Sequence, residues 1–334
     1  MISIVIATCN RAASLRDTLA SLAAIETSRP WEVVVVDNNS SDHTRAILEE
    51  LTPGYPVPLH ALVEREQGRS AALNAGFRAA RGQTIVTTDD DVRVQPDWLE
   101  RIAAGFEAHR CDYLGGRVAP LWGAPPPRWL PARNSQLWAA IALLDYGERP
   151  LRFGTRVPLG VNMAMRREAI ERTGGFDPRI GRKAGTLLGQ EVREWCRRAH
   201  AAGLTGFYVP DVVVQHLIPR ERLTRRYFRR WFYWRGISRA LIYAESGLDM
   251  EKPEQTTLDF ATVPHVAGVP RYLFRSALGA AGDFVAATLR GDDAGAFERE
   301  LWLWTFAGIV RQRWKDRHRP VLGDSLQRAR NGAA

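Results

Sequence analysis

The first hundred residues alternate between short apolar runs and segments in which apolar residues recur at helical spacing. The apolar runs resemble β-strands and lie at Ile2–Ala7, Trp31–Val36, Leu59–Val63 and Thr84–Thr88. The run Trp31–Val36 is continuous rather than alternating, as expected of a strand that is buried on both faces. This alternation of strands and helices predicts a mostly parallel, doubly wound α/β sheet.

Helical patterns separate the predicted strands. Leu15, Leu19 and Leu22 recur at helical spacing, and Ser14 is a candidate N-cap for that helix. Further helices are expected at Ala46–Leu51, where the preceding polar residues can cap the helix, and around Ser70–Ala80.

The middle of the sequence is less regular. Leu121–Pro131 is rich in proline and tryptophan and is expected to form a surface loop or lid. Val157–Met165 has a strand-like pattern, and Glu168–Gly174 indicates a short helix that ends at glycine. Gln190–Ala202 is expected to be a helix, and Phe207–Val214 a strand that ends just before His216.

Polar clusters follow three of the predicted strands, at Thr8–Arg11, Asp37–Asp42 and Asp89–Asp91. In doubly wound sheets, ligands bind beyond the carboxyl ends of the strands, so these clusters predict a site at one sheet edge. Two acids that flank one residue, as in Asp89-x-Asp91, can direct oxygens toward a divalent cation, with a diphosphate supplying further ligands. Such a short pattern is more often an acidic turn, but its position and the other two clusters favour the site.

Other motifs narrow the class of ligand. No GxGxxG follows the first strand and no GxxxxGK[ST] is present, which argues against a dinucleotide-binding oxidoreductase and a P-loop NTPase. Gly68-Arg69-Ser70 precedes a helix and can present N–H groups and a guanidinium to phosphate. Asp37 can accept hydrogen bonds from a base or ribose, or can form an Asx-turn or helix cap.

The composition of the chain limits which cellular compartment and which binding partners are expected. The 334 residues carry a formal net charge of +9, which attracts anionic partners in general. The three cysteines form no CxxC pair, as is typical of a reducing compartment. No basic leader precedes the first apolar run, and no run has the length of a membrane span. We expect a cytoplasmic protein, with peripheral attachment to the inner face of the plasma membrane as an open alternative.

The chain changes character after residue 218, so we place a boundary between a domain at 1–218 and an extension at 219–334. Residues 220–239 read RERLTRRYFRRWFYWRGISR, with eight arginines and one acid. Basic, aromatic helices suit an anionic membrane surface. Packing of the aromatics against the protein, with solvated arginines, is the equally open alternative. Nucleic acid is not expected, because no recognised nucleic-acid-binding motif accompanies the charge.

Several motifs occur in a specific order over about residues 1–218. They are Thr8-Cys9-Asn10-Arg11, Val36-Asp37-Asn38-Asn39-Ser40-Ser41-Asp42, Gly68-Arg69-Ser70-Ala71-Ala72-Leu73-Asn74-Ala75-Gly76, Thr88-Asp89-Asp90-Asp91, Gly160–Arg167, Gly174-Gly175-Phe176-Asp177 and Gly189-Gln190-Glu191. This ordered set resembles the family 2 nucleotide-sugar glycosyltransferases of GT-A fold. The resemblance implies a GT-A-like α/β domain, here followed by a helical C-terminal extension.

The resemblance also implies roles for individual residues. The expected nucleotide and donor ligands are Thr8, Asn10, Arg11, Asp37, Asn39, Arg69, Asn74, Asp89 and Asp90. The expected ligands of a Mg²⁺ or Mn²⁺ ion are Asp89, Asp91 and His216, although a simple polar contact is as good an interpretation of the histidine. Asn162 and Trp195 are expected on the acceptor side. The implied donor is a UDP-, GDP- or dTDP-sugar, and the implied acceptor is a glycan or a lipid-linked molecule.

The general base is where the sequence departs from the family pattern. Relatives usually have Glu-Asp at the start of a helix that ends in Ala-Gly, whereas this chain has Gln190-Glu191-Val192. The helix can be aligned with the family pattern either from Gly189 or back from Gly203, and both alignments place Glu191 at an acidic position. We therefore expect Glu191 to be the base, with Glu194 as the alternative. A helix N-terminal acid favoured by the helix dipole is the non-catalytic interpretation. One base and no evident second nucleophile imply a single displacement that inverts the anomeric carbon.

Two other functions are consistent with the same residues. A sugar-nucleotidyltransferase also binds nucleotide and Mg²⁺ on an α/β sheet, but its glycine-rich phosphate loop is missing, because Thr8–Arg11 contains no glycine. A non-catalytic nucleotide-sugar-binding protein would explain the irregular segment Gln190–Glu194. Metal-dependent transfer or hydrolysis of a sugar nucleotide separates these alternatives.

Overall fold

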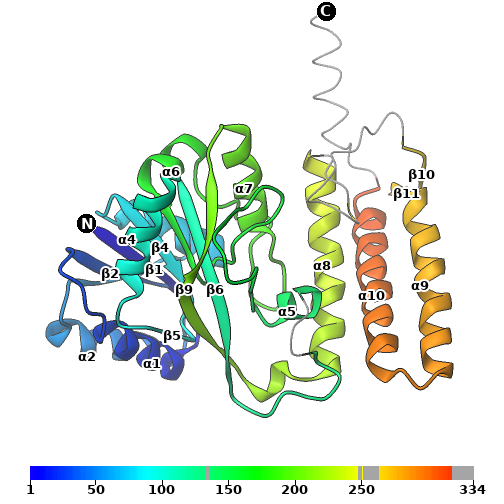
Figure 1. The fold of residues 1–334 in the computed structure, drawn as a ribbon, viewed down its shortest axis with the longest axis horizontal. Helices are drawn as coiled ribbons and strands as arrows, with labels where there is room; N and C mark the ends of the chain where they lie inside the picture. Colours follow the sequence, from blue (N-terminus) through cyan, green and yellow to red (C-terminus); the bar gives the residue numbers. More distant parts are fainter. Residues whose placement is uncertain (132–134, 247–249, 251–262, 318–334) are drawn as a thin grey trace, which may run out of the picture. The chain divides into compact units, whose positions relative to one another are not determined.

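The computed structural model describes residues 1–131, 135–246, 250 and 263–317 (Figure 1). The chain divides into two compact units, each of which is described by itself. The first unit comprises Met1–Ala124, Ile141–Ala184 and Glu191–Pro219. The second comprises Pro125–Ala140, Gly185–Gln190 and the chain from Arg220 onward, so two segments of the central region belong to the helical unit.

The first unit is built on one nine-stranded sheet in the order β3-β2-β1-β4-β8-β6-β9-β5, with β7 paired to β9. The strands are β1 (Ile2–Thr8), β2 (Trp31–Asp37), β3 (Leu59–Val63), β4 (Thr84–Thr88), β5 (Val92–Val94), β6 (Tyr113–Trp122), β7 (Leu151–Arg152), β8 (Met163–Arg166) and β9 (Gly206–Ile218). Strands β1 to β4 are parallel to one another, as are β6 and β9, whereas β8, β5 and β7 pair antiparallel.

Helices pack on the sheet because the strands are apolar on both faces. They are α1 (Ala12–Ala23), α2 (Thr44–Leu51), α3 (Arg69–Ala79), α4 (Trp98–His109), α6 (Arg167–Thr173) and α7 (Glu191–Ala201). Helix α3 contacts β1 and β2, and α4 contacts β6 and β9. Gly76 permits the close approach of α3, since a Cβ there would lie 2.3 Å from a methyl carbon of Val5. This α/β architecture confirms the predicted fold class.

The register of the parallel strands brings their carboxyl ends to one edge. Thr8 at the end of β1 pairs with Asp37 at the end of β2, and Asp37 pairs with Val63 at the end of β3. The loops that follow these strands therefore begin side by side. The predicted strands at Leu59–Val63 and Thr84–Thr88 have the bounds that the sequence indicated.

The prediction that Ser14 caps the first helix is wrong. Helix α1 begins at Ala12, so Ser14 is its third residue and Arg11 occupies the N-cap position without a side-chain cap. The Asp42 carboxylate instead accepts a hydrogen bond from the Ala12 N–H at 3.0 Å. A residue in the next loop thus satisfies a helix-terminal donor, which local sequence cannot reveal.

Strand β9 is longer than the sequence indicated, and it contains His216 rather than ending before it. The expected strand at Val157–Met165 is confined to its end, as β8. Strand β6 lies in the region expected to be irregular, and its last residues, Leu121 and Trp122, were assigned to the loop. Glycine and proline within β6 conceal the strand, because both residues are unfavourable in sheets.

Gly116 marks an irregularity in β6, where the register with β9 shifts. Its backbone lies so close to β9 that a Cβ would be 1.7 Å from the Val212 carbonyl oxygen. The buried side-chain amide of Asn162 lies beside Gly116 and joins the two strands, because it donates to the Arg117 carbonyl of β6 and to the Val212 carbonyl of β9, both at 2.9 Å. Glycine is therefore required here by the distance between two backbones.

We expect Gly116→Ala to lower the free energy of unfolding by about 3 kcal/mol, because backbone rather than a flexible side chain must move. Thermal or urea unfolding measures the change. Gly54→Ala is the matched control, since a Cβ at Gly54 has nothing within 4 Å. The control should alter stability by no more than about 0.5 kcal/mol. Equal stability of the two variants would contradict the close contact of β6 and β9.

The second unit is helical, with α5 (Ser135–Ala140), α8 (Arg225–Ser246), α9 (Arg271–Leu289) and α10 (Asp293–Lys315), and with a small hairpin of β10 (His265–Val266) and β11 (Val269–Pro270). Helix α10 packs against both α8 and α9 (Figure 1). At the α8–α10 crossing, a Cβ on Gly236 would lie 2.0 Å from the Thr305 carbonyl oxygen, and one on Gly308 would lie 2.0 Å from that of Tyr233. Glycine on each helix thus permits close backbone packing.

Aromatic side chains pack within this second unit. The Phe228 ring is buried and meets the rings of Trp129 and Phe297. Several other aromatics are partly exposed, and Trp304 and Trp314 are 40% and 58% exposed.

Among the described residues, no helix has both the length and the apolar character needed to cross a membrane.

Candidate active site

Three carboxylates follow β4, at the sheet edge where the parallel strands end. Asp90 and Asp91 are buried, and the side chain of Asp89 is 27% exposed. Thr8, the last residue of β1, donates its hydroxyl to Asp90 at 2.7 Å. The predicted juxtaposition of the first and third polar clusters is therefore present.

Two arginines offset the charge of these acids. The Arg11 guanidinium contacts Asp91 at 2.6 Å, and that of Arg69 contacts Asp89 at 2.6 Å. Arg11 also lies 3.9 Å from Asp90. Buried charges require such partners, because the interior does not solvate them.

The pKa values of the acids reflect this competition between burial and pairing. Burial favours a raised pKa for Asp89, but the charge and hydrogen bond of Arg69, together with nearby His216, hold the pKa below its usual value. Burial, together with the negative charge of Asp91, raises the pKa of Asp90 to about 7. Neighbouring carboxylates thus differ in their tendency to ionise.

His216 approaches the same acids from β9. Its Nδ1 lies 3.1 Å from the Ile141 carbonyl oxygen, and its Nε2 lies 3.2 Å from an oxygen of Asp91. A carbonyl only accepts hydrogen bonds, so Nδ1 carries a proton and Nε2 is directed at the carboxylate. Nε2 beside Asp91 therefore lies where it can bind a metal ion together with the carboxylate.

The residues fit a divalent cation. One ligand atom from each of Asp89, Asp91 and His216 lies within 4.8 Å of the others. Carboxylate oxygens suit Mg²⁺ and Mn²⁺, and imidazole nitrogen is a common ligand of transition metals. The bond from Nδ1 to a backbone carbonyl is the usual way in which a protein orients a metal-binding histidine.

Glu191 is the first residue of α7 and is buried. Its Oε1 lies 3.2 Å from Nη1 of Arg69, whose Nη2 binds Asp89. One guanidinium thus connects the acid at the start of α7 to the acids after β4. The helix N-terminus further favours a carboxylate at this position.

Glu194 lies one turn further along α7 and belongs to a different cluster. It pairs with Arg198 at 2.8 Å and with Arg197 at 3.3 Å. Arg198 also donates to the Gly175 carbonyl at 2.7 Å. In the described structure, no ion pair or hydrogen bond joins Glu194 to Arg69 or to the acids after β4.

The loops after β1, β2 and β3 are joined by buried and turn-forming polar side chains. Asp37 accepts a hydrogen bond from the Ser40 N–H at 2.9 Å. Asn38 donates to the carbonyls of Glu64 and Glu66 and accepts from the Gly68 N–H at 2.7 Å. Sequence reasoning did not single out Asn38, although its position directly after Asp37 was a signal.

Asn10 and Asn39 organise these loops through the backbone. Both have left-handed conformations, with φ of 54° and 63°, which asparagine tolerates better than most residues. The Asn10 side chain accepts from the Ser41 N–H at 2.7 Å, and Asn39 donates to the Arg65 carbonyl at 2.9 Å.

Three further candidates, the partly buried Asn74 and the buried Asn162 and Trp195, hold the backbone around the site. Asn74 makes two hydrogen bonds to the backbone of Phe176, and Trp195 donates to the Gly174 carbonyl at 3.0 Å. Asn162 is buried between β6 and β9 and also accepts from Trp98. Their expected roles in donor and acceptor binding stay predictions.

Comparison with known proteins gives a consistent result. Residues 3–174 match the family model described as Glycosyl transferase family 2. Glycosyltransferase AglE of Haloferax volcanii is 27% identical over 234 residues, which are 68% of this chain and 71% of the relative. Glucosyl-dolichyl phosphate glucuronosyltransferase of the same organism is 25% identical over 256 residues, 74% of this chain and 80% of the relative.

A similar solved structure is mannosyltransferase PcManGT from Pyrobaculum calidifontis, in complex with GDP-Man and Mn²⁺. The TM-score is 0.61 at 18% sequence identity, with 94% of this chain and 87% of that chain covered. At this level of identity the likeness concerns the fold.

Proposed function

This chain is a glycosyltransferase of family 2, and we propose that it transfers a sugar from a nucleotide-sugar donor to an acceptor hydroxyl, with inversion at the anomeric carbon. One observation supports this most directly. The Arg69 guanidinium lies between Asp89 and Glu191, so the helix-start acid is adjacent to the acids of the Asp-x-Asp motif.

The loops after β1 to β3 supply the donor site in this proposal. Asp37 accepts hydrogen bonds from the nucleoside, and Thr8, Asn10, Arg11 and Asn39 shape the surrounding loops. Arg11 and Arg69 are the cations available for diphosphate. The mannosyltransferase of similar fold was solved with GDP-Man, which is consistent with a nucleotide-sugar donor of the UDP, GDP or dTDP type.

Asp89, Asp91 and His216 hold a divalent ion, Mg²⁺ or Mn²⁺, in this proposal. When bound, such an ion supplies Lewis-acid stabilisation of the charge on a leaving nucleoside diphosphate. The side chains of the protein contribute orientation. The Ile141 carbonyl fixes the tautomer of His216, and Thr8 fixes the Asp90 carboxyl beside the motif.

Glu191 removes the proton from the acceptor hydroxyl as that oxygen attacks the anomeric carbon. The carbon–oxygen bond to the diphosphate breaks as the new glycosidic bond forms, and the proton goes to the carboxylate. Arg69 positions the carboxylate and balances its charge before the acceptor arrives. The acceptor and the leaving group then occupy opposite faces of the sugar, which inverts its configuration.

The acceptor is a glycan or a lipid-linked molecule. The name of one relative, a glucosyl-dolichyl phosphate glucuronosyltransferase, describes a lipid-linked acceptor for that protein. A lipid-linked acceptor would place this chain at the cytoplasmic face of a membrane, and this location is part of the proposal.

A thermal-shift screen of UDP-, GDP-, CMP- and dTDP-sugars, with and without Mn²⁺, tests the donor proposal. We expect one nucleotide class to raise the melting temperature, and to do so more strongly with the ion. Transfer from the donor so identified, followed by NMR of the anomeric proton, tests the stereochemistry. A product that retains the anomeric configuration of the donor contradicts the single displacement.

A further inference from the structure

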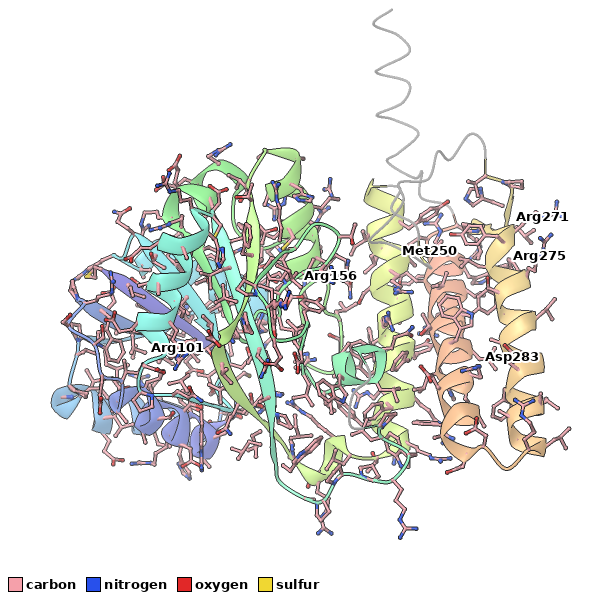
Figure 2. All side chains as sticks on the ribbon, viewed as in Figure 1. Arg101, Arg156, Met250, Arg271, Arg275 and Asp283 are labelled. Atoms are coloured by element: carbon pink, nitrogen blue, oxygen red, sulfur yellow. The ribbon has the colours of Figure 1, made fainter. Side chains whose placement is uncertain are left out.

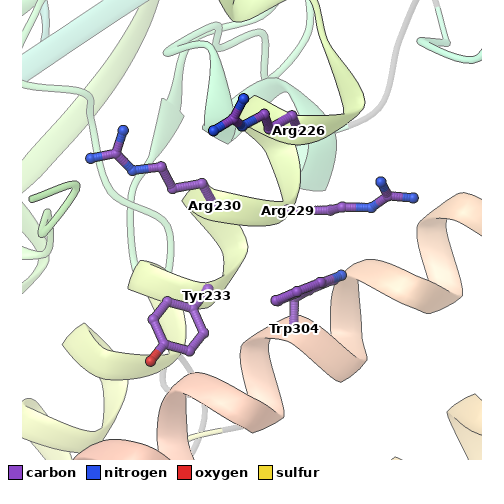
Figure 3. A pocket seen from close by; sticks show the side chains of 5 residues that line it. All are labelled: Arg226, Arg229, Arg230, Tyr233 and Trp304. Atoms are coloured by element: carbon purple, nitrogen blue, oxygen red, sulfur yellow. The ribbon is translucent and has the colours of Figure 1, made fainter.

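The helical unit contains a cleft of about 450 Å³ lined by Arg226, Arg229, Arg230, Tyr233 and Trp304 (Figure 3). The first four residues come from α8, and Trp304 comes from α10. The lining therefore combines three arginine side chains with two aromatic rings. All five residues belong to the same compact unit, and none takes part in the proposed transfer reaction.

The arginines of this part of α8 differ in their partners. Arg225 pairs with Asp293, and Arg229 binds Glu300 through two hydrogen bonds of 2.6 and 2.9 Å. Arg230 donates to the Gly185 carbonyl, which leaves its charge without a carboxylate. Within the described residues, no ion pair or hydrogen bond is found for the exposed Arg226. Two charges of the cleft are therefore neutralised by neither Asp nor Glu.

The aromatic rings form the apolar part of the cleft. The Trp304 indole N–H donates to Glu300 at 2.9 Å, which fixes the ring, and the side chain is 40% exposed. Figure 3 shows the Tyr233 and Trp304 rings beside each other, with the three arginines on the preceding turns of α8 and Arg229 and Arg230 directed to opposite sides. An anionic group at the arginines and an apolar group along the rings would both find complementary surfaces.

We propose that this cleft binds the phosphate headgroup of an anionic membrane lipid. Guanidinium groups match phosphate oxygens in geometry and charge. Tryptophan and tyrosine favour the boundary between headgroups and acyl chains, where one part of the ring is apolar and the other is wet. Unpaired positive charge close to an anionic leaflet adds attraction that salt screens.

The positive charge on α8 does not by itself distinguish a lipid ligand from a nucleic-acid ligand. Arg225 and Arg229 are held by carboxylates of α10, so at the start of α8 the charges without a carboxylate partner are those of Arg226 and Arg230, in the cleft. A confined site with aromatic walls fits a single headgroup better than an extended phosphate backbone, which needs many phosphate contacts.

Sedimentation of the full chain with vesicles tests the proposal. We expect binding to vesicles of phosphatidylglycerol and phosphatidylcholine, and little binding to phosphatidylcholine alone. The variant Arg226→Glu/Arg230→Glu should weaken binding to anionic vesicles by at least about tenfold, since each reversal replaces attraction by repulsion. Trp304→Ala should weaken it less, by about threefold.

The matched control is Arg271→Glu/Arg275→Glu, which makes the same change in net charge on α9. Both arginines are exposed and lie near the start of that helix (Figure 2). The control should bind anionic vesicles within about twofold of the unmodified chain. Equal loss in both double variants would assign binding to general surface charge and overturn the cleft as the site.

Other outcomes also decide the question. Unchanged vesicle binding by the cleft variant overturns the proposal. Retention of inorganic phosphate at the cleft, with no vesicle binding, assigns the site to a soluble phosphate compound instead. Binding of an oligonucleotide that depends on Arg226 and Arg230, without vesicle binding, assigns it to nucleic acid. Arg226→Gln/Arg230→Gln provides a milder variant if the charge reversal unfolds the protein, and it should still weaken binding.

The vesicle assay needs neither donor nor acceptor. Its failure would leave the proposed transfer reaction intact, and failure of the transfer reaction would leave vesicle binding intact. The inference is therefore independent of the proposed transfer reaction, and it bears only on the proposed location at a membrane.

Discussion

Glu191→Gln is expected to reduce turnover by about 10³-fold while changing donor affinity by less than about threefold. The amide cannot accept the acceptor proton, but it has nearly the same shape as the carboxylate. Its carbonyl oxygen can still accept from Arg69, which retains Asp89 as its charged partner at 2.6 Å. Steady-state transfer kinetics and calorimetric titration of the nucleotide measure the two quantities.

Glu194→Gln is the control, because it makes the same chemical change one turn along α7. Loss of its charge weakens the pair with Arg198 at 2.8 Å, so we expect lower stability with turnover within about fivefold of the unmodified chain. If Glu194→Gln abolished transfer and Glu191→Gln did not, the base would be Glu194.

Asp91→Asn is expected to lower kcat/KM by about 10³-fold and to remove the dependence of transfer on Mn²⁺ or Mg²⁺. Asp91 contacts both Arg11 at 2.6 Å and His216 at 3.2 Å, and it is one of the three residues that fit a cation. The amide keeps the volume but loses the negative charge that attracts the ion. Titration of activity with Mn²⁺, and of the protein with Mn²⁺ by calorimetry, measures both effects.

Asp90→Asn provides the comparison for Asp91→Asn. Burial and the charge of Asp91 raise the pKa of Asp90 to about 7, so the uncharged amide resembles a state that this carboxyl already occupies near neutral pH. We expect Asp90→Asn to change donor affinity but to retain the requirement for a metal ion. An Asp91→Asn protein with full activity and unchanged metal dependence would contradict the assigned ligand set.

The sequence predicted the strands at the centre of the first unit well. Continuous apolar runs such as Trp31–Val36 have few alternatives to a strand buried on both faces. It did not predict β6, because its glycines and Pro120 oppose the usual strand composition. Gly116 is explained by the proximity of β9, because a Cβ at this position would overlap the Val212 carbonyl oxygen.

The candidate site was predicted in part by the same reasoning. Parallel strands end at one edge, so the clusters at Thr8–Arg11 and Asp89–Asp91 had to approach each other. Glu191 and His216 were singled out through resemblance to a family rather than through spacing. Their placement depends on α7 and β9, which follow β4 in the chain by about a hundred residues or more.

Which residues form the parallel strands, and which polar clusters end them, can be read from the amino-acid pattern, since burial of both sheet faces requires continuous apolar runs. How the charges meet across the site follows only from the folded chain. Arg69 joins Asp89 to Glu191, a residue 122 positions away, and Asp42 caps a helix that starts 30 positions earlier. Such contacts depend on strand order and loop geometry, and local periodicity contains no information about either.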